Sequence, residues 1–373
     1  MAQLQLNPHL LKVPLYIAGK SIEEVQEELG LDDIVKLGSN ENPLGPSPLA
    51  VAAAAKMLTE AHRYPNYWER VLRRKLGPAI DADFTERNVL IGNGGCDVLR
   101  MVTHAFMCEG GQAITASATF PMFSILTTMF GGRTLEVPMT PDHRFDLSAI
   151  LRAITPSTRL IFLCTPNNPT GTIIKQGEAD EFIAQVPGHV VVVFDESYGD
   201  FATDPEHVDS LRYIKQGRNV VTVRSFSKKS GLANFRVGYA IGQPEIIEYL
   251  HHAQMPFNTG SVALVAAAAS LDDHDYQRRS TELVQTEREY LYAAFDDLDL
   301  NYVRSHANFV LVVDPPVESK ALVEAVLRKG VIIRWAGSMG MPNAFRVTLG
   351  TREQNQQFVA ALRAVLEEAK AVA

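Results

Sequence analysis

The feature that most restricts the fold is a short run of apolar, mostly β-branched residues that ends in a carboxylate. Residues 189–194 read HVVVVF, and Asp195 follows them. The run is apolar on both faces, which is typical of a central strand in a parallel sheet. It therefore predicts a strand with neighbours on both sides, and it places an acidic residue at the carboxyl end of that strand.

Similar strand patterns recur along the chain, with helical patterns between them. Strands are predicted at 89–91, 158–164, 220–223 and 237–241, and helices at 95–107 and 177–186. Strands that alternate with helices indicate an α/β fold with a mostly parallel sheet covered by helices.

The pattern changes after a long charged helix predicted at 275–298. The remaining strands, 309–313, 331–334 and 345–349, alternate with helices at 319–329 and 352–369. A chain of 373 residues is long enough for one large domain and a smaller one. The predicted division is an N-terminal segment at 1–45 that joins the small domain, a large domain at 46–285, and a small C-terminal α+β domain at 286–373.

Composition narrows the classes of function. The formal net charge is −8, which gives no electrostatic basis for binding nucleic acid, and no block of basic residues is present to bind a membrane surface. Any anionic ligand must therefore be held by a few placed cations and backbone amides. The three cysteines form no C-x-x-C pair, so we expect a reducing, cytoplasmic environment.

Lys228 follows a predicted strand and has several phosphate-binding groups near it in sequence. Ser225 and Ser227 offer hydroxyl donors, and Arg236 offers a guanidinium. A lone lysine is usually a solvated surface charge. Beside a phosphate site, however, a lysine can form a Schiff base with a carbonyl, provided that burial or nearby cations lower its pKa.

Asp195 ends the buried strand, where a carboxylate costs free energy unless it is paired. It can serve as a helix cap or turn residue. Alternatively, it can pair with a cationic group of a cofactor, such as a pyridinium nitrogen, because open α/β sheets bind ligands at this end of their strands.

Two loops carry turn residues at predicted strand ends. In the first, Gly92, Gly94 and Gly95 precede a predicted helix, and their amides suit an anion. A dinucleotide-binding G-x-G-x-x-G motif would need glycine where Asp97 stands, so a phosphate cradle fits better than a dinucleotide turn, and a plain tight turn is the alternative. The second loop, NNPTG at 167–171, is a turn that can also direct the Asn168 amide toward a ligand.

Arg346 lies inside an apolar predicted strand, and Arg334 ends another. An arginine in such a run is rarely buried without an anion, which is either an internal carboxylate or a ligand.

Taken together, these segments resemble the fold-type I enzymes that use pyridoxal 5′-phosphate (PLP), and specifically their histidinol-phosphate aminotransferase branch. The resemblance covers nearly the whole chain and is specific in the order and spacing of its motifs. These are KLGSNENPLGPSP at 36–48, RYP at 63–65, GNG at 92–94, TPNNPTGT at 165–172, FDESY at 194–198, RSFSK at 224–228, GLANFRVGY at 231–239, ANFVL at 307–311 and FRVTLGT at 345–351.

The resemblance implies a three-layer α/β/α large domain with a seven-stranded, mainly parallel sheet. It also implies PLP as the cofactor, no metal, and catalytic roles for Lys228, Asp195 and Tyr198. Lys228 carries the Schiff base and then shuttles a proton, and Asp195 pairs with the pyridine nitrogen. The other residues that it implies for cofactor binding are Gly95, Cys96, Phe120 (stacked on the ring), Asn168 (with Tyr198, on the phenolic oxygen), Ser225, Ser227 and Arg236.

A homodimer with shared active sites is implied as well, because Tyr64 would reach the phosphate of the partner subunit. The residues implied for substrate binding are Tyr16, Asn40, Arg334 and Arg346.

The expected reaction is a ping-pong transamination of L-histidinol phosphate with 2-oxoglutarate, in histidine biosynthesis. An aromatic amino-acid aminotransferase is the alternative within the family, and a related PLP decarboxylase or lyase is a further one. From other classes, a nucleotide-binding dehydrogenase conflicts with Asp97. A non-catalytic binding protein of the same fold would be expected to lack Lys228 or Asp195, and both are present.

Overall fold

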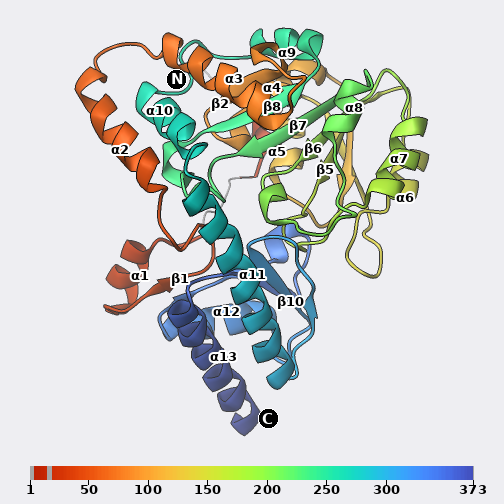
Figure 1. Cartoon of the computed structure of the whole chain (residues 1–373). Helices are drawn as coiled ribbons and strands as arrows, with labels where there is room; N and C mark the ends of the chain where they lie inside the picture. Colours follow the sequence, from red (N-terminus) through yellow and green to blue (C-terminus); the bar gives the residue numbers. More distant parts are fainter. Residues whose placement is uncertain (1–3, 15–18, 373) are drawn as a thin grey trace.

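The computed structural model describes residues 4–14 and 19–372. Its larger part is built on a seven-stranded sheet of order β2-β8-β7-β6-β5-β3-β4 (Figure 1). The strands are β2 (Val89–Gly92), β3 (Gln112–Ala116), β4 (Arg133–Val137), β5 (Thr158–Cys164), β6 (Val191–Asp195), β7 (Val220–Ser225) and β8 (Gly238–Gly242). Every neighbouring pair is parallel except those of β8, which runs antiparallel to β7 and β2. The predicted mainly parallel seven-stranded sheet is confirmed.

The strand that ends in Asp195 is the central one. In β6, Val193 lies opposite Phe162 of β5 and Val221 of β7, and all three side chains are fully buried. Apolar residues on both faces are what this position requires, since helices and loops cover the strand on each side.

Helices connect the strands. They are α2 (Pro48–Met57), α3 (Asn66–Ile80), α4 (Gly95–Phe106), α5 (Met122–Met129), α6 (Leu147–Arg152), α7 (Gln176–Gln185), α8 (Leu211–Lys215), α9 (Pro244–His251) and α10 (Ser261–Ser270). Helix α4 packs across β2, β5, β7 and β8, which places its first residues beside the ends of β6 and β7.

The N-terminal segment contributes a helix that begins with a capping box. Ser21 precedes α1 (Ile22–Leu29), and its Oγ accepts a hydrogen bond from the Glu24 amide at 3.1 Å. The Glu24 carboxylate accepts one from the Ser21 amide at 2.6 Å, which completes the capping box.

The C-terminal part has two small sheets. One is a four-stranded antiparallel sheet of order β12-β13-β10-β9, and the other is a parallel pair of β1 and β11. The strands are β1 (Val35–Lys36), β9 (Tyr302–Val303), β10 (Phe309–Val313), β11 (Val331–Ile332), β12 (Arg334–Trp335) and β13 (Ala344–Thr348). Helices α11 (His274–Asp297), α12 (Ser319–Arg328) and α13 (Arg352–Val372) pack with these sheets (Figure 1).

The structure corrects the single strand predicted at 331–334. The chain there forms two strands that belong to different sheets, β11 beside β1 and β12 beside β13. The change occurs because the N-terminal segment supplies β1 as a partner: Leu37 N donates to Ile332 O at 2.7 Å, and the chain then turns toward β13. Strands β3 and β4 were not predicted.

The described residues include two large hydrophobic cores, and the long helix α11 contributes Val284, Leu291 and Phe295 to the second of them. One surrounds the seven-stranded sheet. The other joins Val35 and Leu37 of the N-terminal segment to Phe345 and Leu362 of the C-terminal part. Within residues 4–14 and 19–372, no helix combines the length and the apolar character needed to cross a bilayer.

Candidate active site

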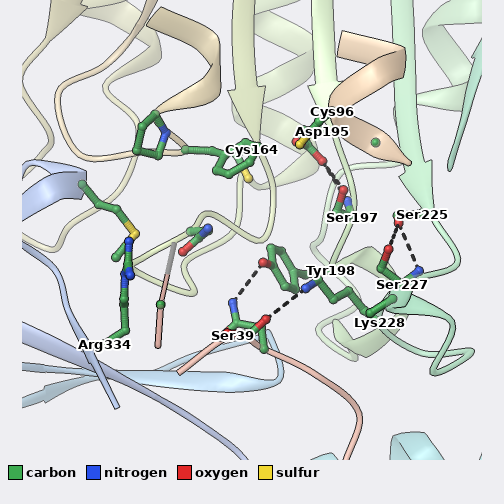
Figure 2. A pocket seen from close by; sticks show the side chains of 18 of the residues that line it. Ser39, Cys96, Cys164, Asp195, Ser197, Tyr198, Ser225, Ser227, Lys228 and Arg334 are labelled. Carbon is green, nitrogen blue, oxygen red and sulfur yellow. Dashed lines mark hydrogen bonds between the residues drawn. The ribbon is translucent and has the colours of Figure 1, made fainter. Parts of the chain in front are cut away.

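A cavity of about 490 Å³ lies where the carboxyl ends of β5, β6 and β7 meet the N-terminal segment and the four-stranded sheet (Figure 2). Most of the predicted site residues line it: Asn40, Gly95, Cys96, Phe120, Asn168, Asp195, Tyr198, Ser225, Ser227, Lys228, Arg236, Arg334 and Arg346. Tyr64 does not line it, and Tyr16 lies outside the described residues. Side chains that are far apart in sequence therefore meet at the edge of the sheet where ligands bind in open α/β folds.

Lys228 extends into this cavity from the loop that follows β7. Its Nζ donates to the Ser39 carbonyl at 3.3 Å and lies 5.6 Å from the centre of the Tyr198 ring. Burial, and secondarily the positive charge of Arg346, lowers the pKa of the Lys228 ammonium to about 8. A sizeable fraction of the amine is therefore neutral near physiological pH, as attack on a carbonyl requires.

Asp195 is buried at the end of β6, between Cys164 of β5 and Val223 of β7. Its Oδ1 accepts two hydrogen bonds from Ser197, one from the amide at 3.0 Å and one from Oγ at 2.6 Å. Burial raises the pKa of the Asp195 carboxyl, while the Ser197 hydrogen bonds lower it. The residue thus makes the local turn contact that was considered for it, and it also lines the cavity.

Tyr198 is held by a residue from the N-terminal segment. Asn40, in the left-handed region with φ 55°, donates from Nδ2 to Tyr198 Oη at 2.9 Å. The Asn40 Oδ1 accepts from Thr348 Oγ1 at 3.1 Å, so both ends of this buried amide are engaged within the protein. Burial raises the pKa of the Tyr198 phenol, which therefore stays protonated as a hydrogen-bond donor.

Hydroxyl, guanidinium and amide groups converge at the start of α4. Ser225 Oγ donates to Ser227 Oγ at 2.9 Å, and Arg236 donates from Nη1 to the Ala233 carbonyl at 2.9 Å. Gly94 caps α4 with φ 85°, and a Cβ at this position would lie 2.2 Å from Arg236 Nη2. The glycine thus leaves room for the guanidinium beside the free amides of the helix, an arrangement that suits a phosphate.

Asp97 has a structural role in the same loop. Its Oδ2 accepts from the Asn93 amide at 2.9 Å and from Asn258 Nδ2 at 3.0 Å. The loop is therefore organised around a carboxylate at the position where a dinucleotide-binding motif requires glycine, which argues against the dehydrogenase alternative.

Arg334 and Arg346 occupy directly opposed positions on β12 and β13. Opposed residues of an antiparallel pair share one face of the sheet, and both arginines line the cavity. Arg346 is buried, donates from Nη2 to the Gly38 carbonyl at 2.8 Å, and is hydrogen-bonded to Asn168 Oδ1. Two guanidiniums that line one cavity are suited to a ligand that carries two negative charges.

Tyr64 lies on the outer surface of the chain. It is 78% exposed and stacks on Phe257 with ring centres 4.5 Å apart. It takes no part in the cavity of its own chain.

Several cavity residues were not predicted from the sequence. Ser197 had a detectable signal, because a hydroxyl two residues after a carboxylate commonly bonds back to it in a turn. Ser39 and Met339 had none: Ser39 stands next to the predicted Asn40, and Met339 between Arg334 and Arg346, but neither residue type by itself indicates a place in a cavity.

Known proteins are similar to this chain in both sequence and fold. The family model for aminotransferase class I and II matches residues 32–362. A histidinol-phosphate aminotransferase of Moorella thermoacetica is 43% identical over 362 residues, which cover 96% of this chain and 92% of the relative. One from Symbiobacterium thermophilum is 41% identical and covers 95% of this chain and 96% of the relative.

Among solved structures, histidinol-phosphate aminotransferase from Sinorhizobium meliloti, in complex with PLP, has the same fold. It superposes with a TM-score of 0.90 at 24% identity and covers 99% of each chain. With its sequence matched over most of its length and its fold shared, the chain belongs to the aminotransferase class I and II family.

Proposed function

We propose that this chain is a PLP-dependent aminotransferase that converts L-histidinol phosphate and 2-oxoglutarate to imidazole acetol phosphate and L-glutamate, a step of histidine biosynthesis. The observation that carries the substrate assignment is the opposed pair of Arg334 and Arg346 on one side of the cavity. The full-length similarity to histidinol-phosphate aminotransferases supports the same assignment.

The residues around the cavity fit PLP group by group. The start of α4, Ser225, Ser227 and Arg236 would hold the phosphate, and the space left by Gly94 admits the Arg236 guanidinium. Asp195 is suited to the ring nitrogen, and Asn168 and Tyr198 to the phenolic oxygen. Phe120 would cover the ring. When bound, PLP supplies an electron sink for charge that develops at the substrate carbon.

The protein supplies binding, orientation and a mobile proton. Lys228 would anchor the cofactor. Its amine would then carry a proton between the substrate α-carbon and the cofactor. A pKa of about 8 suits both directions, because such a group is neither fully protonated nor too weak a base near neutral pH.

Arg334 and Arg346 would receive the anionic end of each substrate in turn. The phosphate of histidinol phosphate is a dianion, and glutamate carries two carboxylates, so the same two guanidiniums can bind both partners of a ping-pong reaction. A planar, forked donor is well matched to either group.

A half-reaction screen tests the proposal. The PLP-loaded enzyme is mixed with one amino donor at a time, and bleaching of the visible absorption of the bound cofactor is followed. Histidinol phosphate and glutamate are expected to bleach it, with phenylalanine at least about 100-fold slower, because it offers no second anion to the arginine pair. If phenylalanine bleaches the cofactor and histidinol phosphate does not, the enzyme is an aromatic amino-acid aminotransferase instead.

We also propose a homodimer in which Tyr64 completes the phosphate site of the partner subunit. A stacked pair of exposed aromatic side chains supports this. Tyr64 and Phe257 are 78% and 47% exposed, and their ring centres lie 4.5 Å apart. Exposed aromatic surface of this kind is typical of a protein–protein interface.

Sedimentation velocity tests the dimer. The wild-type chain is expected to sediment as a dimer. Phe257→Asp is expected to sediment as a monomer that binds PLP at least about tenfold more weakly, because a buried charge disfavours association and Tyr64 leaves the partner's site. Leu135→Asp is the matched control, since Leu135 is 40% exposed on β4 at the opposite edge of the sheet. A wild-type monomer that binds PLP tightly would exclude the shared site.

A cytoplasmic location belongs to the same proposal. Cys96, Cys108 and Cys164 all carry free thiols, as expected in a reducing compartment. The test is fractionation of the source cells. Recovery of the chain among secreted or periplasmic proteins would refute the cytoplasmic location.

A further inference from the structure

We propose that Ser197 is a positioning residue, whose hydroxyl stabilises the Asp195 carboxylate and turns its second oxygen toward the ring nitrogen of the bound cofactor. The proposal rests on the proposed function, since it concerns the Asp195 side chain that would face PLP.

The geometry of the Asp195 carboxylate is asymmetric. In the described part of the chain, this carboxylate accepts two hydrogen bonds, and both come from Ser197 (Figure 2). Both go to Oδ1, one from the Ser197 amide at 3.0 Å and one from its Oγ at 2.6 Å. A hydroxyl–oxygen distance of 2.6 Å is in the range of a strong, charge-assisted hydrogen bond. Oδ1 is thus occupied within the protein, and Oδ2 is left for the group that fills the cavity.

The Ser197 hydroxyl has no competing acceptor among the hydrogen bonds of the described residues, and it lies beside the cofactor site. Ser197 itself lines the cavity, and a Cβ placed on Gly95 would lie 3.6 Å from its Oγ. The hydroxyl is therefore directed at Asp195 from the side of the first residues of α4.

The surroundings of Asp195 otherwise disfavour its charge. Burial raises the pKa of its carboxyl, and the neighbouring carboxylate of Glu196 raises it further. Of the groups on adjacent elements, Cys164 on β5 and Cys96 at the start of α4 are neutral thiols whose pKa values are raised by burial.

Two neighbours act in the favourable direction. The Ser197 hydrogen bonds lower the pKa of the Asp195 carboxyl more than the ammonium of Lys228 does. That ammonium is also temporary, because Lys228 loses its charge when its amine is neutral or bound to the cofactor. Tyr198, on the same loop, stays protonated and neutral. The Ser197 hydroxyl is consequently the side-chain group that favours the ionised carboxylate throughout the reaction.

The consequence concerns the cofactor ring. A carboxylate keeps a ring nitrogen protonated, whereas a carboxylic acid does not, and the protonated ring is the stronger electron sink. Without the Ser197 hydroxyl, Asp195 is expected to take up a proton at higher pH and to hold the ring less firmly.

The test measures binding of pyridoxamine 5′-phosphate to the cofactor-free full-length chain by calorimetry, from pH 5 to 9. This probe has the ring nitrogen and phosphate of PLP but forms no covalent bond with Lys228. At pH 7, Ser197→Ala is expected to bind it about 10- to 100-fold more weakly than wild type, since a hydrogen bond to a charged group is lost. The pH at which affinity falls by half on acidification is expected to be higher in the variant.

Two further variants separate the hydroxyl from other effects. Ser197→Thr keeps the hydroxyl and is expected to stay within about threefold of wild type. Ser124→Ala removes a comparable hydroxyl, which donates to Glu136 Oε1 at 3.0 Å and does not line the cavity. This variant is expected to bind the probe with the wild-type affinity and pH dependence. Circular dichroism of each cofactor-free variant checks that it is folded.

The outcomes separate the role of Ser197 from the proposed function. Equal affinity and equal pH dependence of wild type and Ser197→Ala overturn the role of Ser197 alone, as does equal weakening by the alanine and threonine variants. If the wild-type chain does not bind the probe at all, the proposed function fails, and this inference fails with it.

Discussion

Replacing Lys228 by alanine is expected to abolish covalent attachment of PLP and to slow amino-group transfer by about 10⁴-fold. In the proposed function the residue has two roles that no neighbour can take over. It would anchor the cofactor through its amine, and it would move the proton at the substrate carbon. Among the described residues, Lys228 is the lysine that lines the cavity. Its pKa of about 8 makes its amine both a usable nucleophile and a usable base.

The same lysine predicts how cofactor attachment depends on pH. Only the neutral amine attacks a carbonyl, so the rate is expected to rise about tenfold per pH unit below about pH 7 and to level off above about pH 9. Stopped-flow absorbance of the cofactor-free chain mixed with PLP measures this profile. A profile that rose up to pH 10.5, the ordinary value for a lysine, would show that burial does not lower the pKa of Lys228.

Linkage gives a second readout of this pKa. The folded-state value lies below that of the unfolded chain, so between about pH 8 and 10.5 the unfolded chain binds more protons. Stability of the cofactor-free protein therefore gains a contribution that rises with pH across this window, and Lys228→Ala is expected to remove it. Chemical denaturation at several pH values measures the difference.

Lys229 provides the matched control for Lys228. It is the next residue, but its Nζ lies 3.9 Å from Asp200 Oδ1 and does not line the cavity. Lys229→Ala is expected to keep the absorption of the bound cofactor and the wild-type rate. Normal absorption and turnover in Lys228→Ala would overturn the central assignment of this site.

The second large effect is expected at the arginine pair. Arg334→Gln should lower kcat/KM for histidinol phosphate by about 10²- to 10⁴-fold, because one or two charge-assisted hydrogen bonds to the phosphate are lost, each contributing about 1.5–3 kcal/mol. Arg334 is the better position to change, since the buried Arg346 also holds Gly38 and Asn168 in place.

A substrate that lacks the phosphate makes this test specific. With L-histidinol, wild type and Arg334→Gln are expected to react at similar low rates, because the difference between them is confined to the phosphate contact. Arg304→Gln changes an arginine that lies over the Tyr292 ring and does not line this cavity, and it is expected to leave both rates unaltered. An equal loss with both substrates would mean that Arg334 does not contact the phosphate.

Much of the large sheet could be predicted from local sequence. Residues 189–194 are apolar on both faces, and burial in the middle of a parallel sheet is the arrangement that satisfies such a strand. The helix that begins after Ser21 was likewise predictable, because its cap depends only on residues three apart.

Other elements were not predictable, for identifiable reasons. Strand β4 is largely exposed on one edge of the sheet, and its sequence, RTLEV, has neither a continuous apolar run nor a clear alternation. The division of 331–334 into β11 and β12 depends on pairing with β1, almost 300 residues earlier in the chain. No local pattern encodes a partner at that distance.

The sequence by itself determined the chemistry that this protein can carry out: an amine in Lys228, a strand-end carboxylate in Asp195, and phosphate donors between residues 92 and 236. These assignments depend on residue type and on the rule that parallel strands present their carboxyl ends at one edge of the sheet. Only the tertiary structure decided how the groups are tuned. Burial lowers the pKa of Lys228, Ser197 occupies one oxygen of Asp195, and strand register sets Arg334 opposite Arg346. Desolvation, hydrogen-bond direction and cross-strand register all depend on distances between segments that meet only when the chain has folded.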